Sequence, residues 1–204
     1  MSGSNTYSWP QLLPVGTDDV IMKYFEDSGP VWAPTRHVFA RRFDASGNPV
    51  WAAPAVVSNA GGISAWTQVF PFINDGNDGF FIAWHDDRDF NNLSGIFVQH
   101  IGPSGNALFS SNGIEASLFP NRHHFYAHLA LPEGSDDVFV FWNEMDANQN
   151  NRGIYGQKIS SQGNRMWGDN AKAFIEISPL DIYPFASSQS DNEMVVFYEE
   201  NPSA

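Results

Sequence analysis

The chain has 204 residues, of which 42% are hydrophobic, so it can bury a core and is not expected to be disordered. Asp and Glu number 23 against 10 Lys and Arg, and the resulting charge of −13 repels phosphate backbones and anionic membranes, so we expect no nucleic-acid binding. The absence of cysteine excludes disulfides and zinc–thiolate sites, and no apolar stretch reaches the roughly 18 residues of a membrane-spanning helix, so we expect no membrane insertion.

Strand-forming segments of one kind recur along the chain, starting near residue 20. Each copy is a short run of strand formers that ends in an aromatic residue, one further residue and a carboxylate. The copies are residues 20–26, 80–86, 138–144 and 194–200. A weaker segment and a polar turn precede each copy, clearest at 68–71 and 74–79, with the last turn at 189–192. This arrangement predicts a hairpin of a first and a second strand in each unit.

A second kind of segment follows the first three copies. Its copies are residues 37–51, 95–109 and 153–167. Each contains an aromatic residue, then a Gly-Asn pair, then another aromatic residue, and Gly47, Gly105 and Gly163 are 58 residues apart each time. Because glycine adopts positive φ readily and asparagine tolerates it, the pair predicts the tip of a hairpin between a third and a fourth strand.

These segments predict an all-β fold of antiparallel four-stranded blades, since no window shows helical periodicity. Stacked units of this size suit a partial or assembled β-propeller with about 3.5 repeats of 58 residues. We treat 1–204 as a single propeller-like repeat domain, with repeats at about 9–65, 66–123 and 124–181 and a half repeat at 182–204. A β-sandwich is the structural alternative, but it does not require a strict repeat. The incomplete set of units predicts a fragment of a larger propeller, assembly with another chain, or an open array with a capped end.

Two motifs within the units carry a resemblance to a known family. They are Trp84-His-Asp86-Asp-Arg88 with Gly95-Ile-Phe-Val-Gln99, and Trp142-Asn-Glu144 with Gly153-Ile-Tyr-Gly-Gln157. They resemble the propeller-type repeats of secreted and surface bacterial proteins, which carry Trp-x-Asp-x-Arg, an Ile-Tyr-Ala-Gln strand, a glycine hairpin and a Trp. The resemblance covers roughly residues 9–200. In the third unit Asp146 replaces the Arg of the family motif, and the first unit, with Tyr24-Phe-Glu26, lacks both the Arg and the Gln. It implies an extracellular or cell-surface location and an architecture more than an activity.

The densest charged cluster is residues 86–89, in the expected connection between a second and a third strand. It could form a cation site or a clamp for a polar substrate, and exposed rings nearby would stack on a sugar. The structural alternative is a turn held by an Asp86–Arg88 ion pair and by Asp caps on backbone amides. On the functional interpretation, the predicted binding residues are Trp32, Asp86, Asp87, Arg88 and Phe90.

Metal binding has weaker support in the sequence. Residues 74–78 and 146–150 offer oxygen ligands, but neither matches the spacing of a helix–loop–helix calcium site, so we expect no cofactor and keep Ca²⁺ as an alternative. His124 and His128 would share one face of a regular strand. The neighbouring His123 adds to the metal interpretation, but no carboxylate pattern completes a site beside these histidines, so we expect a structural or surface role for them.

The sequence contains none of the common catalytic or nucleotide-binding motifs, so we predict no catalytic residue. The first hypothesis is a non-catalytic module that binds protein or carbohydrate, or assembles with other copies of the chain or within a larger complex. The first alternative is a fragment of a propeller-type glycoside hydrolase, which requires Glu26, Asp86 and Glu144 to converge on a channel. The second alternative is a calcium-stabilised adhesion module.

Overall fold

The structure is a computed structural model that describes residues 5–190 and 193–201. It has no helix, and 53% of its residues lie in strands, which confirms the predicted all-β class. The strands are β1 (Thr6–Val15), β2 (Asp19–Ser28), β3 (Thr35–Phe43), β4 (Ala55–Ser58), β5 (Phe72–Asn74), β6 (Phe80–Asp86), β7 (Gly95–Ile101), β8 (Ile114–Glu115), β9 (Arg122–Ala130), β10 (Val138–Asp146), β11 (Arg152–Ile159), β12 (Lys172–Ser178), β13 (Asp181–Ser190) and β14 (Glu193–Asn201). Among the described residues, therefore, no helix could cross a membrane.

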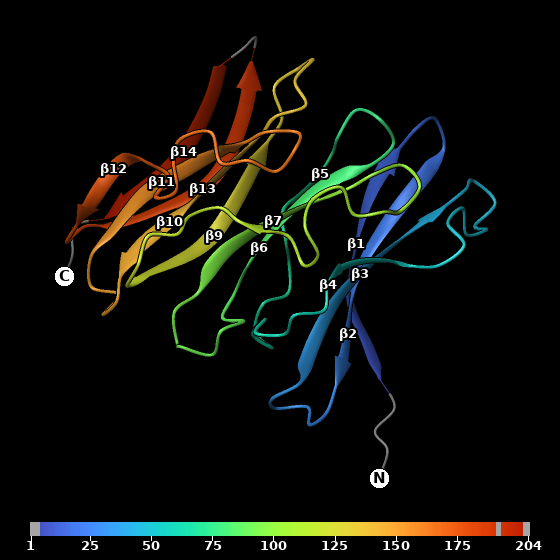
Figure 1. The fold of residues 1–204 in the computed structure, drawn as a ribbon, viewed down its shortest axis with the longest axis horizontal. Coiled ribbons are helices and arrows are strands. Elements are labelled where there is room, and N and C mark those ends of the chain that lie inside the picture. The colour runs from blue at the N-terminus through green and yellow to red at the C-terminus, as the bar shows by residue number, and fades with distance from the viewer. Residues whose placement is uncertain (1–4, 191–192, 202–204) are drawn as a thin grey trace.

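The strands form three four-stranded sheets and one hairpin, each in chain order. Sheet 1 is β1–β4, sheet 2 is β5–β8, sheet 3 is β9–β12, and β13 pairs with β14. Neighbouring strands pair antiparallel throughout, which confirms the predicted four-stranded antiparallel units. Figure 1 shows the sheets following one another from the N-terminus to the C-terminus at the opposite end of the array. They do not close into a ring, so the propeller assembly remains a prediction.

Two of the predicted features at the C-terminal end extend beyond the described residues. The turn at 189–192 includes residues 191–192, and the half repeat at 182–204 includes residues 202–204. The strands on either side of that turn are described and form the β13–β14 hairpin.

The middle strands explain how stacked sheets share two hydrophobic cores. Side chains alternate between the faces of a strand, and in β6 this period divides the residues between neighbours. Phe80, Ile82 and Trp84 enter the core with sheet 1, whereas Phe81 and Ala83 enter the core with sheet 3. β6 is therefore buried on both faces and is apolar along most of its length. In contrast, β2 alternates buried and half-buried positions because sheet 1 has a neighbouring sheet on one face only.

The glycine tips have the predicted left-handed backbone, with φ of +80°, +82° and +83° at Gly47, Gly105 and Gly163. Each tip reverses the chain and leads to a single bridge, such as Phe43 with Pro49, so the fourth strand begins only several residues later. The tips also join the sheets. The Trp51 Nε1–H of sheet 1 donates to the carbonyl of Pro103 in the next tip at 2.7 Å.

A bulge in β9 overturns the expectation that His124 and His128 share a face. His124 lies opposite Glu144, and His128 lies opposite Phe141, with one extra residue on β9 between them. Because positions 141 and 144 of β10 point to opposite faces, the two histidines do so as well. His128 Nε2 lies 3.1 Å from the carbonyl oxygen of Pro184, whereas the His124 ring packs beside Trp142. A bulge of this kind leaves no signal in apolar periodicity.

Candidate functional site

The structure places the predicted binding residues on two different sheets. Trp32 lies in the β2–β3 connection of sheet 1, and the other four lie at the end of β6 and in the β6–β7 connection of sheet 2. Trp32 and Phe90 are 84% and 76% exposed, in keeping with their expected positions in connections. Asp86, at the other extreme, is buried. Asp86 and Arg88 line one pocket, described below, whereas Trp32, Asp87 and Phe90 do not, so the structure does not gather the five residues at one site.

The Asp86 carboxylate is satisfied within sheet 2. Arg88 donates to it from Nε at 2.9 Å and from Nη2 at 2.7 Å, and Trp84 Nε1 donates to Oδ2 at 2.7 Å. The Arg88 guanidinium also lies 3.3 Å from the centroid of the Phe97 ring. Its Nη1 donates to the carbonyl of Asn112, so this ion pair ties the β6–β7 connection to the turn before β8. The predicted Asp86–Arg88 pair is thus present.

Asp87 caps the same connection. Its carboxylate accepts hydrogen bonds from the backbone N–H groups of Asn91 and Asn92, at 2.9 and 3.0 Å. Its own backbone N–H donates to the carbonyl of Gly62 and joins the connection to the segment before β5. Such bonds match the structural interpretation of the cluster.

The carboxylates that end the second strands are bonded within their own sheets. Trp142 Nε1 donates to Glu144 Oε2 at 2.7 Å, which repeats the Trp84–Asp86 bond 58 residues later. In sheet 1, Glu26 hydrogen-bonds the hydroxyl of Tyr7 on the neighbouring strand, which raises the pKa of Tyr7. The convergence that the hydrolase alternative requires is therefore absent among Glu26, Asp86 and Glu144.

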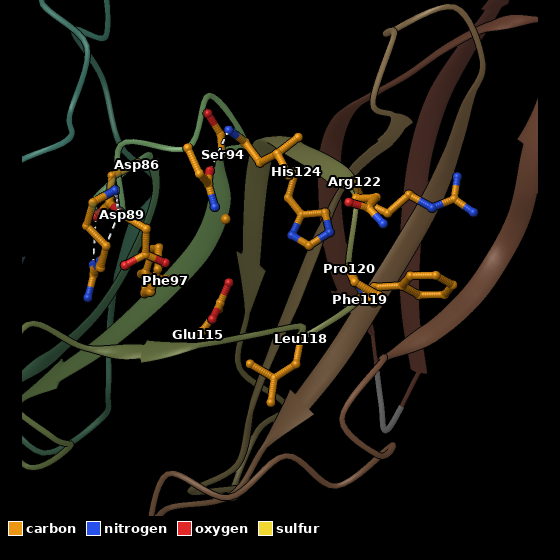
Figure 2. A pocket seen from close by; sticks show the side chains of 15 residues that line it. Asp86, Asp89, Ser94, Phe97, Glu115, Leu118, Phe119, Pro120, Arg122 and His124 are labelled. Carbon is orange, nitrogen blue, oxygen red and sulfur yellow. Dashed lines mark hydrogen bonds and ion pairs between the residues drawn. The ribbon is translucent and has the colours of Figure 1, made fainter.

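A pocket of about 320 Å³ lies where the β6–β7 connection approaches the start of β9 (Figure 2). We call it the charged pocket and define it by Glu115, Leu118, Phe119, Arg122 and His124. Its wall also includes the Asp86–Arg88 pair. Figure 2 shows the His124 ring between Glu115 and Arg122, with Leu118 and Phe119 below them. Four strands of two sheets thus bring acidic, basic and apolar groups to one cavity.

Asp89 and Glu115 line the charged pocket without a hydrogen-bond partner for their carboxylates among the described residues, and Glu115 is the less exposed of the two. Burial raises the pKa of its carboxyl group, Asp89 acts in the same direction, and nearby His124 opposes the shift. Gly95 makes room for the carboxylate, because a Cβ at Gly95 would lie 2.6 Å from Glu115 Oε1. Glu115 can therefore accept a hydrogen bond or, when protonated, donate one to a molecule in the pocket.

His124 lines the charged pocket and lies beside the buried carboxylate of Glu144. Its Nε2 lies 3.2 Å from Glu144 Oε2, but neither ring nitrogen has a partner in hydrogen-bonding geometry among the described residues. Arg122 Nε lies 4.0 Å from the other Glu144 oxygen, and its guanidinium stacks 4.9 Å from the Phe119 ring centroid. The pocket can thus bind a small polar group by hydrogen bonds along an apolar wall.

Sequence reasoning found only part of the pocket. Asp86 and Arg88 were among the predicted binding residues, whereas Glu115, Arg122 and His124 lie on two sheets and no motif or fixed spacing connects them. The pair at His123 and His124 suggested a metal rather than a polar pocket.

The oxygen-rich turns use their carboxylates for the backbone. Asp75 accepts from the N–H groups of Asn77 and Gly79, and His100 Nε2 lies 2.8 Å from its second oxygen. Asp146 accepts from the N–H of Asn150 at 2.9 Å. Across residues 5–190 and 193–201, no group of three or more His, Asp or Glu side chains is arranged to hold a metal ion.

Comparison with known proteins adds no family assignment. No protein-family model matches the sequence, and a search of curated proteins gives no match.

Proposed function

We propose that the chain is a non-catalytic binding or assembly module of an extracellular or cell-surface protein, built from propeller-type repeats. The observation that carries this proposal is which polar groups are already hydrogen-bonded within the sheets and which are open to solvent. The recurring carboxylates Asp86 and Glu144 are hydrogen-bonded inside their sheets, whereas the groups of the charged pocket, Glu115 above all, face a cavity open to solvent. The recurring carboxylates thus stabilise the sheets, whereas Glu115, which does not recur, is available to a partner.

Exposed apolar side chains on the connections support the same proposal. Val31 and Trp32 project from the β2–β3 connection and Phe90 from the β6–β7 connection, all more than three-quarters exposed. Large exposed rings at loop tips are typical of protein or carbohydrate contact surfaces. In addition, the β13–β14 hairpin has no third strand within the described residues, which leaves a place for strands of another copy or of a larger protein.

Light scattering on a sizing column tests assembly directly. A molar mass at a multiple of 22.7 kDa would support self-assembly, because the strands that complete the last hairpin would then come from other copies. A mass that stays at 22.7 kDa over a hundredfold range of concentration (on the order of 1–100 µM) would remove self-assembly and leave the binding role alone.

One observation favours the hydrolase alternative: a half-buried Glu115 with a raised pKa has the property of a general acid. Turnover of aryl glycosides separates the two proposals, and we expect none above the buffer rate. Turnover that is lost in Glu115→Gln but kept in Asp18→Asn, an exposed carboxylate outside the charged pocket, would overturn the non-catalytic proposal.

A further inference from the structure

A second groove, of about 430 Å³, lies between the segment that precedes β5 and strand β9. We call it the aromatic groove and define it by Trp66, Thr67, Gln68, His85, Phe125 and Tyr126. Its two sides come from sheets 2 and 3, whose strands β6 and β9 are in contact (Figure 1). The groove was not predicted, because its aromatic residues belong to different units.

Two aromatic rings in the groove are available to a ligand. Trp66 is 89% exposed and Tyr126 is 53% exposed, although aromatic side chains of this size are normally buried in a β-sheet protein. The Tyr126 ring packs against two neighbouring rings, since its centroid lies 6.1 Å from that of Phe125 and 6.0 Å from that of Tyr183. The groove therefore offers the packed Tyr126 ring on one side and the exposed Trp66 indole on the other.

The backbone at Tyr126 adopts an unusual conformation to present this ring. Its φ is +56°, which is an outlier for a bulky residue, and it occupies the bulge of β9. Bulges re-aim side chains and are frequent beside functional sites. The same bulge and a positive φ recur at Trp9 in β1, so the conformation belongs to the repeat, and in β9 it places the Tyr126 ring in the lining of the groove.

Apart from the aromatic rings and Val69, the side chains that line the groove are polar and uncharged, although the whole chain carries a charge of −13. Gln68 is exposed, and its amide has no hydrogen-bond partner among the residues that the structure describes. Thr67 Oγ1 lies 3.4 Å from His85 Nε2, and burial lowers the pKa of His85 to about 4, so the imidazole is neutral at pH 7. None of the described lining residues supplies a carboxylate, ammonium or guanidinium group.

A neutral groove with ring faces and amide and hydroxyl groups fits a particular ligand chemistry. A hexopyranose has an apolar face of C–H groups that stacks on an aromatic ring, and hydroxyls around its edge that both donate and accept hydrogen bonds. A charged ligand would find no counter-ion in this lining, and a purely apolar ligand would leave the Gln68 amide without a partner.

We propose that the aromatic groove binds a neutral hexopyranose unit of an oligosaccharide, with Trp66 and Tyr126 stacking on the sugar and Gln68 hydrogen-bonding its hydroxyls. This inference rests on the proposed binding function. It names the ligand class and places the contact in a groove separate from the charged pocket.

Calorimetric titration with cellohexaose and with maltohexaose tests the assignment at pH 7. We expect saturable binding of at least one of them, and a Kd that rises roughly tenfold in Trp66→Ala and in Tyr126→Ala. Trp9→Ala is the matched control. Like Tyr126, Trp9 has a positive φ, lies at the equivalent bulge of its strand, β1, and is exposed, but it lies outside the groove. Circular dichroism verifies that each variant is folded.

The outcomes that overturn the groove assignment are distinct from those that overturn the binding function. Absence of binding by both oligosaccharides at millimolar concentration, or equal weakening by Trp66→Ala and Trp9→Ala, would show that the groove is not a sugar site. If an oligosaccharide binds and its affinity responds to Glu115→Gln but not to Trp66→Ala, the binding function stands and the site is the charged pocket.

Discussion

The glycine tips allow the contact between sheets to be measured separately from backbone strain. Gly47 and Gly105 occupy equivalent turns with φ of +80° and +82°, so an alanine at either position suffers the same unfavourable left-handed conformation, about 1–2 kcal/mol. Their surroundings differ. A Cβ at Gly47 would meet nothing within 4 Å, whereas a Cβ at Gly105 would lie 2.8 Å from Cδ2 of Trp51.

We therefore expect Gly47→Ala to lower the free energy of unfolding by about 1–2 kcal/mol. Gly105→Ala should lower it by about 2–5 kcal/mol, since displacing the packed indole adds about 1–3 kcal/mol. Gly163→Ala should fall between them, because its Cβ would lie 3.2 Å from Phe109. Urea unfolding followed by far-UV circular dichroism gives the three values under one condition.

A double-mutant cycle identifies the source of the difference. In a Trp51→Ala background the collision is gone, so Gly105→Ala should cost no more than Gly47→Ala does in the parent chain. Equal destabilisation of the parent by Gly47→Ala and Gly105→Ala would refute the reasoning, because it would mean that the sheets do not meet at this tip.

Three further predictions concern buried groups and metals. Lys23 is buried over the Phe25 ring, and desolvation lowers its pKa to about 7, so the unfolded chain binds the proton more tightly and stability rises between pH 7 and 10.5. Lys23→Met should remove that rise and increase stability at pH 7 by about 1–4 kcal/mol, whereas an unchanged pH profile would contradict the shift. Trp142→Phe should destabilise the chain by about 1.5–3 kcal/mol through the lost bond to buried Glu144. Trp84→Phe should be less destabilising, because Arg88 still binds the Asp86 carboxylate. Chemical denaturation of the two variants would refute this reasoning if Trp84→Phe proved the more destabilising. Addition of EDTA should leave the melting temperature unchanged, and a clear decrease would favour the calcium-stabilised alternative.

Several features of the fold could be predicted from the sequence because they depend on local chemistry at fixed spacing. The Gly-Asn pairs predicted the left-handed tips, since few residues other than glycine tolerate that conformation. The runs that end in an aromatic residue and a carboxylate predicted the second strands, and Trp84–Asp86 and Trp142–Glu144 turn out to bond in the same way. The indole N–H needs an acceptor when it is buried, and two residues along a strand places one on the same face.

Other features depend on which sheets meet. The bulge at Tyr126 changes the facing of the strand without changing its composition, so it separated His124 from His128 and brought His124 beside Glu144. The same extra residue turned the Tyr126 ring toward a groove shared with Trp66. The Asp86 cluster illustrates the reverse case, because its charges looked available in the sequence and are paired in the structure.

The sequence by itself determined the all-β class, the order of the strands and the places where the chain reverses, because turn propensity and strand periodicity act over a few residues. Only the tertiary structure decided which polar and aromatic groups remain open to a ligand. Glu115 with His124, and Trp66 with Tyr126, come from neighbouring sheets, and their proximity follows from the stacking of those sheets and from one bulge. Such contacts between units are set by packing over the whole array and leave no local pattern in the chain.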